Sequence, residues 1–278
     1  MVFLCLAILC SCAIALFMRL SANKVTARLS MLSVNYLICA LLGAAYAGFD
    51  LICPAVSGFS TTVALGAVGG ILYLVSFILL QWNTGRNGIV LSSVFMKLGL
   101  LVPMTLSVLV FHELPTGTQI TGFCIALIAI VLINAKKESS ASRFHWELLL
   151  LLLLGGSADA MTKVFEALGP AALSNQFLFY IFAVALVLCV TLAVYQKERP
   201  GIRELLFGAA IGIPNFLSSK FLLRSLAELP AVVVYPSFSI ATMLITTLVG
   251  VLFFRERLLK LQWLAMVAIV AALFLLNL

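Results

Sequence analysis

Long apolar runs alternate with short polar connections along the whole chain. The runs cover residues 2–20, 30–48, 61–81, 88–111, 117–135, 146–167, 173–195, 203–226, 230–254 and 259–277. Each is close to the length of about 20 residues that a helix needs to cross about 30 Å of hydrocarbon. The runs lack the alternation of barrel strands, and lipid offers no partner to unpaired backbone groups. The pattern therefore predicts an all-α membrane protein with ten transmembrane helices.

Polar positions of the first half of the chain recur in the second half at an offset of 143 residues. The recurring pairs are Glu113 and Glu256, Gln119 and Gln262, and Asn134 and Asn277. Three polar matches in one frame indicate two related halves of five helices each. We predict a first repeat at residues 1–135, a cytoplasmic linker at 136–146 and a second repeat at 147–278.

The basic residues predict the orientation of the helices. Of the 17 Lys and Arg residues, 13 lie at the odd connections: Arg19, Lys24, Arg28, Arg86, Lys136, Lys137, Arg143, Lys197, Arg199, Arg203, Arg255, Arg257 and Lys260. Since connections rich in Lys and Arg stay in the cytoplasm, we expect both termini to be extracytoplasmic. Five helices per repeat is an odd number, so the second repeat must be inverted relative to the first.

Composition excludes most other classes of protein. With 64% apolar and 10% charged residues, the chain cannot bury its apolar surface in one water-soluble core. The net charge of +7 comes from short clusters between apolar runs, which argues against a nucleic-acid surface. The seven cysteines contain no C-x-x-C pair, and the chain has no P-loop and no zinc-protease motif. We therefore expect no metal site, no cofactor and no enzymatic activity.

Short motifs at the junction of the last two helices of each half resemble a known family. They are His112-Glu113-Leu114, Gln119 and Gly122 in the first half, and Arg255-Glu256-Arg257-Leu258, Gln262 and Ala265 in the second. With the ten-helix pattern, the chain resembles the EamA-like branch of the drug/metabolite transporter superfamily. It departs from that pattern at Ala265, where Gly is common, and at Ser11-Cys12 and Gly155-Gly156, where Trp-Gly is frequent.

The resemblance implies an architecture and a range of substrates. It implies a central cavity lined by helices 1 to 4 and 6 to 9, with helices 5 and 10 at the periphery, where a homodimer would form. The family carries amino acids, sugars, nucleotide sugars, choline and drugs. The compact chain, without long tails, indicates a multi-pass protein of the cell membrane, and specifically of a bacterial inner membrane.

Charged residues within the apolar runs are the main candidates for substrate binding. Lys97 lies near the middle of the fourth run, where a lone lysine costs about 2.5–3.5 kcal/mol unless it faces a cavity or a counter-ion. We expect it to hold the negative end of a substrate, with a structural ion pair as the alternative. Asp159 either pairs with Lys163 one turn later or takes part in substrate binding or proton coupling.

Further candidates are polar or aromatic residues inside other runs. Lys220 either binds an anion or extends to the lipid headgroups. The remaining predicted substrate-binding residues are Asn35, Tyr36, Tyr73, Asn215, Ser219 and Tyr235. For each of these, a helix–helix hydrogen bond is the alternative interpretation.

The sequence thus predicts a secondary transporter that works by alternating access. The favoured substrate is a small organic metabolite with a carboxylate, such as an amino acid, and a proton or ion would be the coupling partner. One alternative is a cationic or quaternary ammonium compound or drug, with Tyr36, Tyr73 and Tyr235 as cation–π walls. The alternative from another class is a non-transporting membrane sensor or an intramembrane enzyme.

Overall fold

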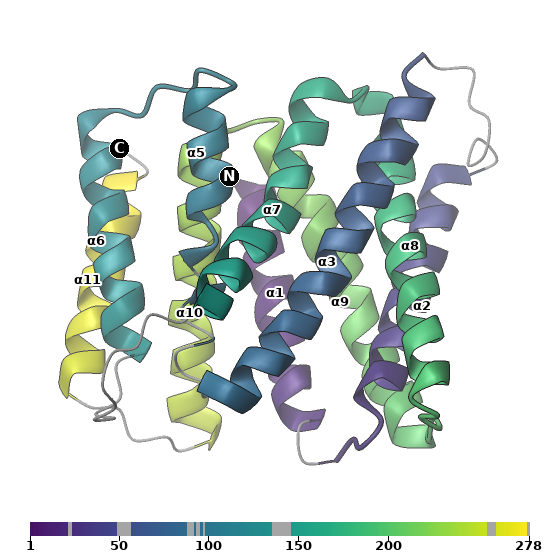
Figure 1. The fold of residues 1–278 in the computed structure, drawn as a ribbon. Coiled ribbons are helices and arrows are strands. Elements are labelled where there is room, and N and C mark those ends of the chain that lie inside the picture. Colours follow the sequence, from purple (N-terminus) through teal and green to yellow (C-terminus); the bar gives the residue numbers. More distant parts are fainter. Residues whose placement is uncertain are drawn as a thin grey trace. The chain divides into compact units, whose positions relative to one another are not determined.

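The computed structural model describes residues 1–21, 24–48, 57–87, 92, 95–96, 98–134, 146–254 and 260–276, and these contain helices and no strand. The helices are α1 Val2–Ser21, α2 Arg28–Ala47, α3 Phe59–Asn87, α5 Leu101–Leu109, α6 Gly117–Asn134, α7 Trp146–Leu168, α8 Ser174–Tyr195, α9 Ile202–Leu226, α10 Ala231–Phe254 and α11 Lys260–Leu276, with a short 3-10 turn η2 at Ala171–Leu173 (Figure 1).

Seven of the described helical segments are long and apolar enough to cross a membrane. They lie in α1, α2, α3, α7, α8, α9 and α10. The predicted all-α, multi-pass class is therefore confirmed. The count of ten spanning helices and the inverted relation of the halves stay predictions.

The fourth predicted span, residues 88–111, is interrupted at Gly99 and Leu100, which form a turn before α5 begins at Leu101. Pro103 has no N–H to donate to the carbonyl of Gly99, four residues earlier. That carbonyl instead accepts the N–H of Val102 at 2.9 Å, which tightens the turn to the 3-10 type. A proline inside the apolar run thus separates α5 from the residues before it.

The helices form two compact units, and each unit contains helices from both predicted halves. Unit 1 comprises Met1–Leu74 and Met161–Glu228, and unit 2 comprises Val75–Ala160 and Leu229–Leu278. The predicted repeats at 1–135 and 147–278, with the linker at 136–146, divide the chain in sequence order. The two units group segments by their contacts, so they do not test these boundaries. Of the predicted linker, residues 136–145 lie outside the described part of the chain.

Unit 1 is held together by helices that approach closely at glycines. In it, α2 packs against α8 and α9, and α1 packs against α9. A Cβ atom built at Gly208 of α9 would lie 2.6 Å from the carbonyl oxygen of Met31 and from Cβ of Val34. Gly66 of α3 lies in a similar contact, where a Cβ would be 2.7 Å from Cβ of Tyr180 in α8. Small residues are typical of such membrane helix contacts.

In unit 2, α6 and α11 form a close pair, and α10 packs against α5, α6 and α11. The buried residues of this contact include Met104, Ala129, Ile240 and Ala272. Ile240 is the predicted repeat counterpart of Lys97, and it is fully buried, as an apolar residue at a helix–helix contact should be.

Carboxylates from neighbouring segments bind the N-terminal ends of two helices. After α5, His112 takes a left-handed conformation with φ 54°, and the next residue, Glu113, accepts the N–H of Ala231 at 2.8 Å, at the start of α10. After α8, Lys197 has φ 56°, and Glu198 accepts the N–H of Ser30 at 2.8 Å, in the first turn of α2. Free N–H groups and the helix dipole both favour an anion at these places.

Glu113 belongs to the short motif on which the family resemblance rests. Its carboxylate also accepts the hydroxyl of Ser107 at 3.0 Å, which fixes the side chain against α10. Its role in the structure is therefore to join helix ends within unit 2. Its predicted repeat counterpart, Glu256, lies outside the described residues.

Candidate functional site

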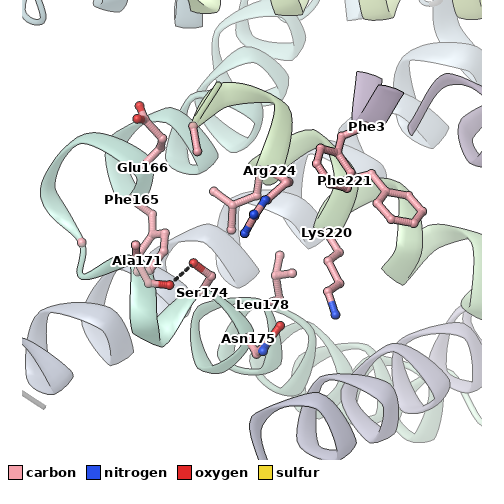
Figure 2. A pocket seen from close by; sticks show the side chains of 13 residues that line it. Phe3, Phe165, Glu166, Ala171, Ser174, Asn175, Leu178, Lys220, Phe221 and Arg224 are labelled. Atoms are coloured by element: carbon pink, nitrogen blue, oxygen red, sulfur yellow. Dashed lines mark hydrogen bonds between the residues drawn. The ribbon is translucent and has the colours of Figure 1, made fainter. Parts of the chain in front are cut away.

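Unit 1 contains a cavity of about 430 Å³, a size typical of sites for small molecules. It lies where the start of α1, the end of α7, the start of α8 and the end of α9 meet (Figure 2). Apolar side chains form much of its wall, among them Phe165, Leu178 and Phe221. Five polar or charged side chains lie on the wall: Glu166, Ser174, Asn175, Lys220 and Arg224. The Ser174 hydroxyl donates to the carbonyl oxygen of Ala171 at 2.6 Å, so the other four decide the chemistry of the cavity.

Lys220 is the half-buried cation of this wall, and it extends from the polar stretch of α9. Its Nζ lies 3.1 Å from the centroid of the Tyr46 ring, a cation–π contact. In the described part of the chain, no carboxylate lies within ion-pair distance of this ammonium group. A positive charge in a mainly apolar cavity without a carboxylate beside it favours an anionic ligand.

Arg224 lies one turn after Lys220 and is more exposed. Its side chain is 66% exposed, and its Nε lies 3.9 Å from a carboxylate oxygen of Glu228. Its guanidinium carbon lies 5.5 Å from the centroid of the Phe3 ring. Such an exposed pair contributes little to stability, so Arg224 can adjust at the rim of the cavity.

Glu166 supplies the negative charge on the wall, and this charge is balanced inside unit 1. A carboxylate oxygen of Glu166 lies 2.6 Å from Nζ of Lys163, whose side chain is only 6% exposed. Because Lys163 compensates Glu166 and Glu228 lies near Arg224, Lys220 is the cation on the wall that determines the net charge that a ligand meets. The cavity therefore favours anions.

Asn175 adds a hydrogen-bond acceptor on the α8 side of the cavity. Its Nδ2 donates to the carbonyl oxygen of Tyr46 at 3.0 Å. A backbone carbonyl can only accept, so the amide nitrogen must be the atom that faces Tyr46. The amide oxygen of Asn175 points the other way, toward the side on which Leu178 and Lys220 lie (Figure 2).

A row of aromatic rings continues from the Lys220 contact into the core of unit 1. Tyr46 stacks on Phe216, with centroids 5.6 Å apart, and Phe216 lies 6.3 Å from Phe182. Phe182 contacts both predicted binding residues of this region, Tyr36 at 6.5 Å and Tyr73 at 6.2 Å. Tyr36 is only 1% exposed. The rings therefore pack on one another and leave no open cage among them.

The predicted residues Asn35 and Asn215 lie together and bind each other. Nδ2 of Asn215 donates to Oδ1 of Asn35 at 3.1 Å, which joins α9 to α2. Both side chains are buried. In this structure the two amides form an interhelical hydrogen bond, the alternative that the sequence had left open.

The other predicted residues are more widely distributed. Ser219 is half-buried on α9. Tyr235 and Asp159 belong to unit 2, where the Tyr235 hydroxyl donates to the backbone oxygen of Asp159 at 2.9 Å. Lys163 lies in unit 1, paired with Glu166. Lys97 lies outside the described residues.

The sequence did not predict Tyr46 or Glu166 as residues of the site. Tyr46 lies in the last turn of α2, and tyrosines are common at such helix ends because they favour the membrane–water interface. Its contact with Lys220 could therefore not be predicted from the sequence. Glu166 follows Lys163 at a spacing of three residues, and this could have indicated the ion pair.

Comparison with other proteins finds a relative and a solved structure that each match nearly the whole chain. An uncharacterized protein of Haemophilus influenzae is 25% identical to it over 280 residues, which cover 96% of this chain and 94% of that protein. The crystal structure of another protein has the same fold, with a TM-score of 0.73 at 15% identity, and covers 99% of this chain and 94% of that one.

The family resemblance is confirmed in the second half of the chain. Residues 145–278 match the EamA-like transporter family. The match includes α8 and α9, from which Asn175, Lys220 and Arg224 extend. Residues 145–278 are therefore similar to the EamA-like transporter family, part of the drug/metabolite transporter superfamily.

Proposed function

We propose that this protein is a secondary transporter of small organic metabolites with a carboxylate, such as amino acids, and that it works by alternating access. The observation that carries the proposal is the ammonium group of Lys220, which lines the unit 1 cavity beside an aromatic ring, with no carboxylate of the described residues within ion-pair distance. Lys220 would hold the carboxylate of the substrate, and the amide oxygen of Asn175 would accept a hydrogen bond from another part of it. Lys97, which the sequence predicts to hold the negative end of the substrate, lies outside the described residues.

A cationic substrate fits this cavity less well. The ring of Phe3 on the wall and the ring of Tyr46 beside it already lie against protein cations, Arg224 and Lys220 respectively. A quaternary ammonium compound would need open aromatic faces of this kind. Of the tyrosines predicted as cation–π walls, Tyr36 and Tyr235 are 1% and 3% exposed.

The proposal of alternating access draws support from helix pairs that the sequence offset relates. At an offset of 143 residues, α2 corresponds to η2 and most of α8, and α6 corresponds to α11. Cys189 contacts Leu29 and Asn175 contacts Tyr46, so α2 and α8 run antiparallel. Gly122 of α6 lies against Ala272 and Leu275, so α6 and α11 also run antiparallel. Inverted repeats that rock about a binding site would place their counterpart helices in this way.

We propose that both termini are extracytoplasmic in the cell membrane of a bacterium. The charge distribution carries this proposal, since the basic residues cluster at the odd connections. A fluorescent reporter fused after Lys137 should fluoresce in the cytoplasm, and alkaline phosphatase fused after Leu278 should be active. A fluorescent C-terminal reporter together with an inactive phosphatase fusion would show the opposite orientation.

Uptake by the purified protein in proteoliposomes tests the proposed function. Vesicles loaded with unlabelled amino acids should accumulate label from a radiolabelled mixture of the common amino acids, and vesicles without protein should not. A second mixture of labelled mono- and dicarboxylates extends the test to other carboxylates. A sensor or an intramembrane enzyme would show binding or turnover without accumulation, and that outcome in both mixtures would refute the proposal.

A further inference from the structure

We infer that Tyr46 is a positioning residue for the substrate site: its ring holds the ammonium group of Lys220 at the cavity. The inference rests on the proposed function, because it assigns to Lys220 the role of binding the carboxylate. Tyr46 itself is not among the residues that line the cavity. It would act through Lys220 and need not touch the substrate.

The contact between Tyr46 and Lys220 is close. Nζ of Lys220 lies 3.1 Å from the centroid of the Tyr46 ring, well within the distance of about 6 Å at which a cation is attracted to a ring face. The attraction is larger where water is partly excluded, and Lys220 is half-buried. The ring therefore supplies a defined position for an otherwise flexible side chain.

Tyr46 is itself held in place on two sides. Its ring stacks on Phe216 at an interplanar angle of 16°, and Phe216 is fully buried. Its carbonyl oxygen accepts a hydrogen bond from Asn175, which lines the same cavity. Contacts to both α8 and α9 thus hold the last turn of α2, and the stack on Phe216 orients the Tyr46 ring, which is 51% exposed.

Without the ring, Lys220 would have another favourable position. It lies six residues before the end of α9 at Leu226, about 9 Å along the axis at about 1.5 Å per residue. A lysine at that depth can extend along its stem toward the lipid headgroups. The ring of Tyr46 competes with the headgroups for the ammonium and keeps it at the cavity. In this arrangement Lys220 takes the first of the two roles that the sequence leaves open, the binding of an anion.

A spectroscopic test needs no knowledge of the substrate. Reductive methylation with labelled formaldehyde turns lysines into dimethyl-lysines that keep their charge and give resolved NMR signals. In the purified protein, the Lys220 signal, assigned by its loss in Lys220→Arg, should be shifted upfield by the Tyr46 ring current. The shift should persist in Tyr46→Phe, which keeps a ring, and disappear in Tyr46→Leu. An unshifted Lys220 signal in the unmodified sequence would overturn the inference.

Transport kinetics test the functional consequence. With the amino acid that is taken up best in the proteoliposome assay, Tyr46→Leu should raise KM about 5- to 30-fold, the range expected from loss of a partly desolvated cation–π contact, and leave Vmax unchanged. Tyr46→Phe should restore KM to near the original value. A purely structural role of the ring would instead lower Vmax or the melting temperature in Tyr46→Leu.

The outcomes separate this inference from the proposed function. If Lys220→Met loses transport but Tyr46→Leu keeps its KM, the positioning role of Tyr46 is wrong and the function stands. If no labelled compound is taken up while the Lys220 signal is shifted, the function is wrong and the Tyr46–Lys220 contact stands. A lower KM in Tyr46→Leu would show that the ring competes with the substrate, which also overturns the inference. Should Tyr46→Leu fail to fold, Tyr46→Met provides a ringless side chain of similar volume.

Discussion

Lys220→Met is expected to reduce uptake of the amino acid substrate by about 10- to 100-fold, measured as Vmax/KM in proteoliposomes. A charge-assisted hydrogen bond to a carboxylate contributes about 1.5–3 kcal/mol, and the substitution removes it from the cavity wall. The folded protein should persist, because methionine fills a similar volume and no longer places a charge in a mainly apolar cavity. The melting temperature should therefore stay the same or rise.

Arg224→Met is the matched control for this experiment. It removes a cation from the same cavity and the same helix, but one that is 66% exposed and lies near Glu228. We expect a smaller decrease, within about fivefold, since an exposed charge pair contributes about 0–1 kcal/mol. Unchanged uptake in Lys220→Met would refute its role as the carboxylate-binding residue. Equal losses in both variants would favour a general effect of positive charge at the cavity mouth.

Gly208→Ala is expected to destabilise the protein by about 1–3 kcal/mol, the usual cost of overpacking a close contact. The new Cβ would lie 2.6 Å from the carbonyl oxygen of Met31 and from Cβ of Val34, so α9 would have to move away from α2. The carbonyl is backbone and cannot move alone. Alanine raises helix propensity by about 1 kcal/mol, which opposes the loss but does not cancel it. A decrease of several degrees in apparent melting temperature should be measured in detergent.

Gly117→Ala is the control for the glycine experiment. Gly117 begins α6, and a Cβ at this position would meet no atom within 4 Å. The same substitution should therefore leave the melting temperature unchanged or raise it slightly. If Gly208→Ala proved as stable as Gly117→Ala, the contact between α2 and α9 would not be as close as the structure has it.

The same contact also bears on transport. Gly212 lies one turn after Gly208, and a Cβ there would be 2.7 Å from Cβ of Ile38. Three residues later in α9, Asn215 donates its hydrogen bond to Asn35 of α2. The glycines thus bring the helices close enough for this short polar side chain to reach across. Since Lys220 lies on the same helix, its position at the cavity also depends on the spacing between α2 and α9.

The candidate site could be predicted from the sequence only in part. A lysine inside an apolar run is costly in lipid, so Lys220 could be selected as functional without knowledge of the fold. The same reasoning selected Lys97, which lies outside the described residues. It also selected Asn35 and Asn215, which bind each other, because a polar side chain that joins two helices and one that binds a ligand look alike in a sequence.

The sequence by itself determined the class of the protein and the positions of its helices. Length and hydropathy are local properties of a segment, and lipid forces an apolar run of that length into a helix. Eight of the ten predicted spans therefore coincide with described helices to within two residues, whereas 61–81 lies inside the longer α3 and 88–111 contains the shorter α5. Even the break before α5 has a local cause in Pro103, although the uninterrupted apolar pattern concealed it.

Only the tertiary structure decided which of these residues meet. The ring of Tyr46 and the ammonium of Lys220 are far apart along the chain and lie 3.1 Å apart in unit 1, and the carboxylate of Glu113 binds the first turn of a helix that begins at Ala231. Such contacts depend on helix rotation, on crossing points at glycines and on side-chain direction, and these are set by packing between segments distant in sequence. The hydropathy of one segment carries no information about the face that its neighbour presents, so the cavity and its positive charge became visible only in the assembled unit.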